Sequence, residues 1–378
     1  MPIPQRLLIS LSLFLLAGLL PAAPPPEPPP IDAAGYLLID MDSGRVLAES
    51  QADQRLEPAS LTKIMTAYVV FNELREGTLK LDDTALVSKK AWKTPGSRMF
   101  IEVGRQVSID DLLRGMVIQS GNDASVALAE HIAGSEETFA GLMNQHAQRL
   151  GMDNTNFVNA TGLPATEHYT TPRDIVRVTS AMIREFPDYY RLYSERSFTF
   201  NDIKQYNRNK LLWRDDSVDG VKTGHTEAAG YCLVATAKRQ NMRLISVVMG
   251  TASEDARAKE SQALLNFGFR FFETHRLYAA GEALLKTRVW KGEPQEAPVG
   301  LAEDLYVTIP RRQYKNLEAK TVLDQRLQAP IARAQPIGRI VLTLEGETVE
   351  ERPLISLADV PLGGLFTQGM DSLLLMLE

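Results

Sequence analysis

The chain has 378 residues, of which 44% are hydrophobic and 23% are charged, and its formal net charge at pH 7 is -6. This length allows a substantial hydrophobic core and predicts two domains. Nucleic-acid-binding domains usually carry a strongly basic face, whereas this chain has no compact run of Lys and Arg, so we expect no nucleic-acid partner.

The N-terminus has the features of an export signal. Arg6 precedes an apolar run at residues 7–20, which is shorter than a helix needs to span a bilayer comfortably. Small residues follow this run, so we predict a cleaved signal peptide at residues 1–23, with an uncleaved N-terminal anchor as the alternative. In both cases the remainder is exported, and the proline-rich residues 24–31 are expected to form an extended tether.

A β-hairpin followed by several helices is predicted for the first half of the exported part. Apolar runs on both sides of a short polar turn predict the hairpin over residues 35–50. Apolar residues at helical spacing predict a helix over residues 58–77, and further helices over residues 108–150 and 172–186. The helix at 58–77 is apolar on most of its circumference, so we expect it to run through a core.

The pattern becomes strand-like in the second half of the chain. Three strands are predicted at residues 218–226, 230–240 and 242–250, and an amphipathic helix at residues 260–275. Strands at both ends of a helical segment predict an α+β fold, in which one sheet carries a helical insertion. Shorter alternating segments separated by Gly and Pro predict a small all-β domain over residues 276–362.

The first candidate site is the sequence PASLTKIMT, which contains Ser60 and Lys63. Residues three apart on a helix share a face, so Lys63 is within reach of the Ser60 hydroxyl. Serine needs a neighbouring base to accept its proton, and a lysine, with a reference pKa of ~10.4, acts as that base only when burial or another cation lowers its pKa. The alternative is a capping serine beside a solvent-exposed lysine.

A second polar cluster, SGN, lies at residues 120–122 between two predicted helical segments. A short turn containing Gly121 would expose the side chains of Ser120 and Asn122, and the Ser120 hydroxyl would be able to pass a proton to a leaving group. The alternative is a plain N-terminal cap for the following helix.

A third cluster, KTG, lies at residues 222–224 on a predicted strand. The absent side chain of Gly224 lets a ligand or another backbone approach closely. Lys222 would supply positive charge for a carboxylate and would lower the pKa of a neighbouring Lys63. The alternative is a strand lysine that faces solvent.

In this order, Ser-x-x-Lys, Ser-x-Asn and Lys-Thr-Gly resemble the motifs of the penicillin-binding serine acyl-transferase superfamily. The stretches PASLTKIMT, SGNDA, VDGVKTGHT and GFRFFET look like the low-molecular-mass D-alanyl-D-alanine carboxypeptidases of peptidase family S11. The resemblance covers essentially the whole mature chain. It implies a catalytic domain at residues 32–275 of the β-lactamase and penicillin-binding transpeptidase type, with an antiparallel sheet and a helical insertion, followed by the β-rich domain.

The resemblance also implies roles for individual residues. Ser60 would be the acylated nucleophile, Lys63 its proton acceptor and Ser120 a proton relay. Asn122 would hold the substrate amide. The backbone N–H groups of Ser60 and His225 would form an oxyanion hole, which is usually the largest electrostatic contribution to acyl transfer.

A site for the terminal carboxylate of the substrate is implied at the third cluster. Lys222 and Thr223 would bind the carboxylate together with Arg257, which occupies the matching place in the sequence EDARAKES. Gly224 would let the substrate lie close to the strand.

The implied activity is removal of the terminal D-alanine from peptidoglycan pentapeptide stems through an acyl-enzyme, with β-lactam antibiotics as covalent inhibitors. The implied location is the periplasm, in peripheral association with the outer face of the cytoplasmic membrane. We expect no cofactor and no metal, because the helical His131 and His146 lack H-E-x-x-H spacing. His168 is expected at the surface.

Three alternatives remain at this stage. A DD-endopeptidase would use the same constellation on a longer substrate, and a non-enzymatic cell-wall binding module would be expected to lack at least one motif residue. A class A β-lactamase needs a carboxylate that activates water. The only glutamate in the relevant loop is Glu167, and Thr171 stands where an asparagine partner would be expected.

The C-terminal residues 363–378 form a possible membrane-associating tail. They are rich in Leu and Met and contain no Lys or Arg. Their only charged side chains, Asp371 and Glu378, would be repelled by an anionic lipid surface, so we predict weak peripheral binding.

Overall fold

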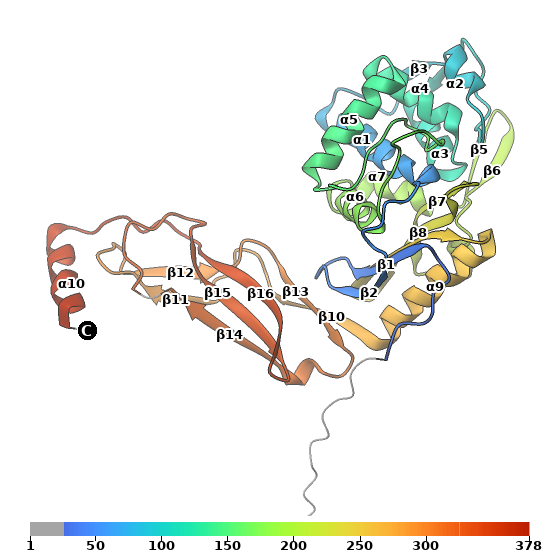
Figure 1. Cartoon of the computed structure of the whole chain (residues 1–378). Coiled ribbons are helices and arrows are strands. Elements are labelled where there is room, and N and C mark those ends of the chain that lie inside the picture. Colours follow the sequence, from blue (N-terminus) through green and yellow to red (C-terminus); the bar gives the residue numbers. More distant parts are fainter. Residues whose placement is uncertain (1–25, 325, 378) are drawn as a thin grey trace, which may run out of the picture.

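The computed structural model describes residues 26–324 and 326–377, which form a compact sheet-and-helix region followed by an elongated β-rich region (Figure 1). The predicted signal peptide lies outside the described residues. Residues 26–31, the described part of the predicted tether, contain no helix or strand.

The first region is built on a five-stranded antiparallel sheet with the order β2-β1-β9-β8-β7. Its strands are β1 (Gly35–Asp40), β2 (Val46–Ser50), β7 (Val218–Thr226), β8 (Gly230–Arg239) and β9 (Met242–Thr251). The N-terminal hairpin pairs with β9, so strands from both ends of the region lie side by side and the chain between them forms a helical insertion. The predicted α+β fold class is confirmed.

Alternation along the strands divides the core between the two faces of the sheet. On β1, Leu37 and Ile39 pack into the core shared with the helical insertion, whereas Leu38 packs into a second core on the other face. Helix α6 (Pro172–Glu185) covers the first face and α9 (Glu254–Phe271) covers the second.

The amphipathic helix predicted at residues 260–275 was wrong in its bounds. Helix α9 begins at Glu254, because the Ser253 side chain accepts a hydrogen bond from the Ala256 N–H and caps the first turn. It ends at Phe271, and the chain continues directly into strand β10 (Phe272–Tyr278).

The helical insertion surrounds α1 (Thr62–Glu76), which is buried along most of its length and ends at Gly77 in a left-handed conformation. Its other helices are α2 (Lys89–Lys93), α3 (Ile109–Ile118), α4 (Asn122–Ala133), α5 (Glu136–Arg149), α7 (Pro187–Tyr190) and α8 (Leu211–Arg214). Two small hairpins complete it: β3 (Thr84–Leu86) with β4 (Gln106–Ser108), and β5 (Ser197–Phe200) with β6 (Ile203–Tyr206).

The second region is a β domain with a core of its own. Strand β10 pairs with β13 (Leu305–Pro310), and a five-stranded antiparallel sheet has the order β11-β12-β16-β15-β14. The strands of this sheet are β11 (Leu285–Arg288), β12 (Glu296–Gly300), β14 (Leu317–Leu323), β15 (Pro336–Leu344) and β16 (Glu347–Ser356). A buried polar contact joins the two regions, since Thr274 donates to the Asp40 carboxylate at 2.8 Å.

The chain ends in helix α10 (Leu365–Leu377), which lies at the end of the β domain away from the first region (Figure 1). We expected an anionic lipid surface to repel Asp371, but this side chain is buried against the β domain. Its carboxylate is 1% exposed, pairs with Arg288 at 3.1 Å and accepts the Lys291 N–H at 2.6 Å. Within the described ranges, no helix is long and apolar enough to cross a membrane.

Candidate active site

Ser60 lies at the entry to α1, in a short 3-10 turn over Ala59–Leu61. The Ser60 side chain caps neither this turn nor α1, so the capping alternative is not what the structure shows. The Ser60 hydroxyl instead accepts a hydrogen bond from Lys63 Nζ at 3.0 Å. Ala59 has a φ of 44°, a conformation that is rare outside glycine and is often found at functional sites.

Lys63 is 1% exposed and its ammonium nitrogen has three fixed neighbours. Besides Ser60, it contacts Asn122 Oδ1 at 2.7 Å and the Thr161 carbonyl oxygen at 2.5 Å. An amide oxygen and a carbonyl oxygen are acceptors only. A neutral Lys63 therefore uses its two N–H donors on these two groups, and its lone pair is left for the Ser60 hydroxyl proton.

The pKa of Lys63 fits this role. Burial lowers it from 10.5 to about 7, and the positive charge of Arg208 acts in the same direction. The carboxylates of Asp123 and Glu136 oppose this shift. A substantial fraction of Lys63 is therefore neutral near pH 7, as a base for Ser60 requires.

The SGN cluster meets Lys63 from the start of α4. Asn122 is the first residue of this helix, and its amide is held in place because Nδ2 donates to the Pro95 carbonyl at 2.6 Å. Gly121 occupies the cap position and makes no side-chain cap, so the capping alternative fails here also. Ser120 has a φ of 66°, and its hydroxyl accepts a hydrogen bond from Lys222 Nζ at 2.8 Å.

Lys222 is only 2% exposed, so the solvent-facing alternative for the KTG cluster is wrong. Its Nζ also donates to the Thr223 carbonyl at 3.0 Å. Burial holds the pKa of Lys222 well below its usual range, and repulsion from Lys63 adds to the effect. The predicted repulsion between the two lysines is thus present, although Arg208 is the cation that lowers the pKa of Lys63.

These groups open into one cavity of about 410 Å³. Its lining includes seven of the predicted site residues: Ser60, Ser120, Asn122, Thr223, Gly224, His225 and Arg257. Lys63 and Lys222 lie behind this lining and contact it through Ser60 and Ser120. Strand β7 passes close to the nucleophile, because a Cβ added at Gly224 would lie 3.3 Å from the Ser60 nitrogen.

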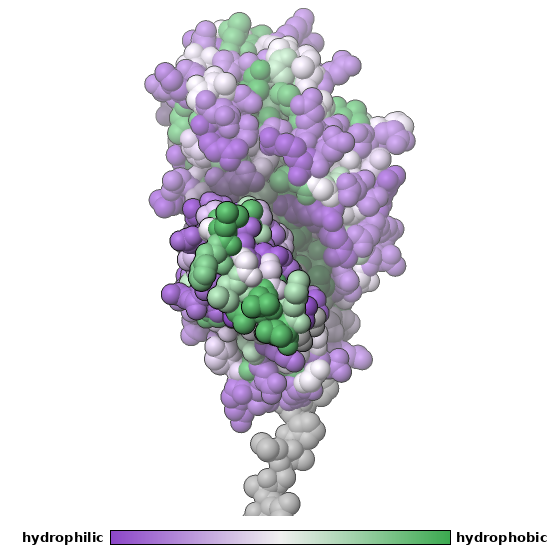
Figure 2. Space-filling view, turned by 90° about the vertical axis from the view of Figure 1, so that its left-hand side faces the viewer, coloured by the Kyte–Doolittle hydropathy of each residue, from purple (hydrophilic) through white to green (hydrophobic). Residues whose placement is uncertain are grey.

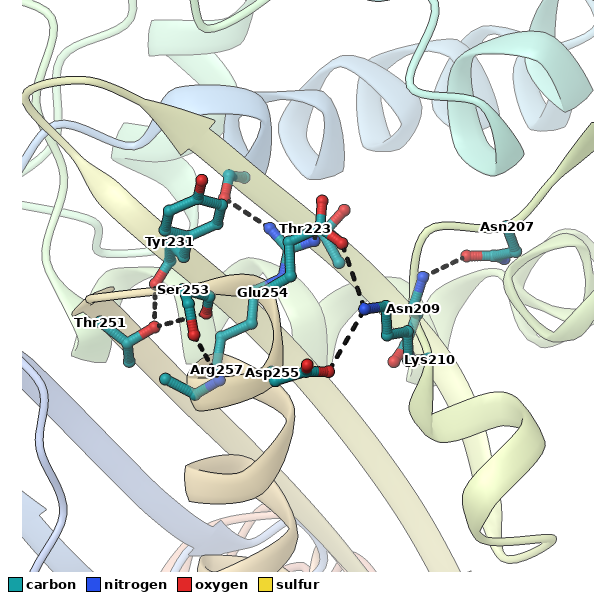
Figure 3. Close-up of polar contacts among 12 residues, drawn as sticks. Asn207, Asn209, Lys210, Thr223, Tyr231, Thr251, Ser253, Glu254, Asp255 and Arg257 are labelled. Carbon is teal, nitrogen blue, oxygen red and sulfur yellow. Dashed lines mark hydrogen bonds and ion pairs between the residues drawn. The ribbon is translucent and has the colours of Figure 1, made fainter.

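The predicted carboxylate site is formed by the first turn of α9 and the end of β7, which a hydrogen bond from Arg257 joins (Figure 3). Arg257 is 5% exposed and donates from Nη1 to the Gly224 carbonyl at 3.1 Å. The Tyr231 ring has two neighbours here: the Arg257 guanidinium, 5.6 Å from the ring centroid, and the His225 ring, which stacks on it with the centroids 3.9 Å apart. Glu254 lines the cavity beside Arg257 and pairs with Lys210 at 3.3 Å.

Several lining residues were not predicted from the sequence. Arg208, Tyr231, Glu254 and the loop at residues 159–163 belong to no motif that we considered. The conformation of the loop is held by Asn159, whose Oδ1 accepts hydrogen bonds from the backbone N–H groups of Thr161 and Gly162. Gly162, in the sequence NATGL, was the only local sign of a turn.

The predictions for two residues outside the motifs have different outcomes. His168 is buried, which corrects the expectation of a surface position; it accepts the Val158 N–H and contacts the Thr62 hydroxyl at 2.9 Å. Glu167 is exposed and does not line the cavity, which agrees with the absence of a deacylating carboxylate of the β-lactamase type.

Two family profiles match the chain. The family described as D-alanyl-D-alanine carboxypeptidase matches residues 22–253, and the C-terminal domain of penicillin-binding protein 5 matches residues 272–362. Among curated proteins, the chain is 47% identical to the D-alanyl-D-alanine carboxypeptidase DacC of Escherichia coli K12, over 91% of this chain and 88% of that protein. It is 45% identical to DacA of the same organism, over 93% of this chain and 89% of that protein.

Solved structures show the same likeness. The structure is similar to penicillin binding protein 5 from Haemophilus influenzae, with a TM-score of 0.87 and 43% identity, over 89% of this chain and 99% of that one. It is also similar to penicillin-binding protein D2 from Listeria monocytogenes in its ampicillin-bound form, with a TM-score of 0.59 and 30% identity, over 63% of this chain and 98% of that one.

Proposed function

The chain belongs to the family of D-alanyl-D-alanine carboxypeptidases, peptidase S11, and on that premise we propose that Ser60 and Lys63 release the terminal D-alanine of a peptidoglycan pentapeptide stem. The observation that carries this proposal is the set of contacts around Lys63. Two acceptor-only groups take both N–H donors of the neutral amine, and its lone pair faces the Ser60 hydroxyl at 3.0 Å.

The reaction begins when Ser60 Oγ attacks the carbonyl carbon of the penultimate D-alanine and its proton moves to Lys63 Nζ. The oxyanion that forms lies against the backbone N–H groups of Ser60 and His225. The C–N bond then breaks, and the leaving amine takes a proton, with Ser120 as the relay. Water attacks the resulting ester, returns a proton to Ser60 and frees the shortened peptide.

Recognition of the free carboxylate is assigned to Lys222, Thr223 and Arg257. Among the residues that the structure describes, the Arg257 guanidinium has one hydrogen bond, to a backbone carbonyl, and its nearest carboxylate, that of Glu254, is 3.9 Å away. The guanidinium therefore keeps donors for a carboxylate that enters the cavity. This requirement for a free C-terminus favours carboxypeptidase over endopeptidase activity.

Acylation by β-lactams follows from the same site, and a relative of this fold holds ampicillin. The motif residues are all present and one cavity is lined by residues of all three motifs, which speaks against a non-enzymatic binding module. Since Glu167 does not line the cavity, we expect the penicillin ester to persist rather than to be hydrolysed efficiently.

Replacement of Ser60 by alanine tests the assignment. After exposure to benzylpenicillin, intact-protein mass spectrometry should show an adduct on the unmodified protein and none on the Ser60→Ala variant. Ser194→Ala is the control, because Ser194 is exposed and lies outside the cavity, and it should form the adduct normally. Release of D-alanine from a pentapeptide should follow the same pattern. An adduct on Ser60→Ala would refute the proposed nucleophile.

The location proposed for the enzyme is the periplasm, at the outer face of the cytoplasmic membrane. The export signal and helix α10 support it. Figure 2 shows apolar side chains gathered on the face where the C-terminal helix lies. The exposed apolar residues of α10 are Leu365, Phe366, Met370, Leu373, Leu374, Met376 and Leu377. Binding of the folded protein to lipid vesicles is the measurement that tests this location.

A further inference from the structure

A second groove continues from the active-site cavity past the loop at residues 159–163. It has a volume of about 400 Å³ and is lined by Lys90, Lys93, Thr94, Pro95, Glu136, Asn159, Thr161 and Leu163. Thr161 and Leu163 line both the groove and the cavity, so the two spaces meet at this loop. No role has been assigned to this groove in the reaction described above.

The groove joins the cavity away from the carboxylate site, because none of Lys222, Thr223 and Arg257 lines it. Arg257 and Thr223 line the cavity but not the groove, whereas Thr161, whose carbonyl contacts Lys63, lines both. A peptide whose C-terminal carboxylate is held by Arg257 places its reacting carbonyl at Ser60. The residues that precede the reacting bond then leave the cavity on the side of the groove.

The two lysines that line the groove differ in whether their charge is paired with a carboxylate of the protein. Lys90 pairs with Glu136 at 2.8 Å, and the same Glu136 carboxylate accepts the Ala160 N–H at 3.2 Å, so this pair braces the loop. Lys93 is exposed, and within residues 26–324 and 326–377 no carboxylate lies within 4.0 Å of its ammonium group. Lys93 therefore presents a positive charge at the edge of a groove with apolar walls at Pro95 and Leu163.

We propose that this groove binds the part of the stem peptide that precedes the D-alanyl-D-alanine end, and that Lys93 pairs with a free carboxylate carried there. The proposal rests on the proposed function, since it takes the bound orientation from the carboxylate site. It adds that the enzyme prefers peptides that carry a free carboxylate upstream of the reacting bond.

Two peptides that end in D-Ala-D-Ala test the proposal. They differ only upstream, where one carries a free carboxylate as glutamate and the other its amide as glutamine. The Lys93→Gln variant should lower kcat/KM for the acidic peptide about two- to fivefold, as expected for an exposed ion pair, and leave the amide peptide unchanged. Lys89→Gln is the matched control, because Lys89 is exposed on the same short helix but does not line the groove.

The outcomes separate this proposal from the assigned activity. If Lys93→Gln has no effect on the acidic peptide, or affects both peptides equally, the groove does not read the carboxylate and the proposal is overturned. Calorimetric binding of both peptides to Ser60→Ala supplies a readout without turnover. If the unmodified enzyme released no D-alanine while Ser60→Ala still bound the acidic peptide better through Lys93, the proposed function would fail and the groove would stand.

Discussion

Arg208 shows how a residue outside every motif sets the chemistry of those within them. It lies at the rim of the cavity, and its positive charge lowers the pKa of both Lys63 and Lys222. Both lysines are fully buried, and burial disfavours their charged forms still more strongly. The site is thus biased toward a neutral Lys63 before any substrate arrives.

The pH dependence of acylation should report this bias. Because Ser60 needs a neutral Lys63, the rate of penicillin acylation should rise with pH through about 7, the pKa of Lys63. Arg208→Gln removes a charge that lowers this pKa, so the rising limb should move to higher pH, and Arg208→Lys should largely restore it. Arg214→Gln is the control, since Arg214 is exposed and lies outside the cavity. An unchanged profile in Arg208→Gln would contradict the electrostatic role.

At the scale of single residues, the sequence allowed prediction of those site residues that lie within a few positions of one another. Ser60 with Lys63, Ser120 with Asn122, and Lys222 with Thr223 are local patterns. In the structure, Lys63 contacts Ser60 and Asn122, and Lys222 contacts Ser120. Arg208 lowers the pKa of lysines distant from it in the chain, and Glu254 pairs with Lys210, which is also distant in the chain. No local pattern distinguishes them from other surface charges, so they could not be predicted.

At the scale of elements, the entry to α1 and the loop at residues 159–163 act as one unit. Gly162 has a φ of 84°, and a Cβ added there would lie 1.8 Å from the Ala59 carbonyl oxygen. The turn that carries Ser60 and the loop that supplies the Thr161 carbonyl are therefore packed backbone against backbone. This contact fixes the positions of the two segments relative to each other.

Gly162→Ala should disrupt this contact. The positive φ alone costs about 1 kcal/mol for alanine, and the overlap with Ala59 adds to it. We expect a clear fall in the free energy of unfolding and a slower acylation rate, because the Thr161 carbonyl moves away from Lys63. Gly134→Ala is the control that separates the cost of a positive φ from the cost of the overlap. Gly134 has a φ of 75°, but an added Cβ there would have nothing within 4 Å. Equal losses in denaturation and acylation for both variants would show that the overlap is relieved without consequence.

The predicted elements agree best with the structure where a regular apolar pattern continues over a long segment. Residues 58–77 and the three strands after residue 218 were placed within a few residues of their observed bounds. The start of α9 was missed because its first turn is polar, EDARAK, and only the Ser253 cap defines it. The hairpin of β5 and β6 was not predicted at all. Buried His168 was misplaced, because its contacts with Thr62 and Val158 come from tertiary packing.

At the scale of the whole molecule, α10 is docked on the β domain by one face. Asp371, paired with Arg288, lies on that face, and projection at 100° per residue places the exposed apolar side chains of the helix other than Leu374 on the opposite half. The ion pair of Asp371 with Arg288 therefore fixes which face of α10 contacts the β domain. Its position far from the catalytic region in Figure 1 leaves the active site clear of any surface that α10 touches.

Membrane binding by α10 should depend on apolar burial and little on lipid charge. The outward half of the helix carries no cation, so its affinity comes from side chains such as Phe366 and Leu373 entering the bilayer interface. The chain without residues 1–23 should co-sediment with phosphatidylcholine vesicles about as well as with vesicles containing phosphatidylglycerol, and added salt should change this little. Deletion of residues 363–378 should abolish the binding, and Phe366→Ser with Leu373→Ser should weaken it. Gln368→Ser, on the half that faces the β domain, is the control. Binding that survives the deletion, or that requires anionic lipid, would place the membrane contact elsewhere in the molecule.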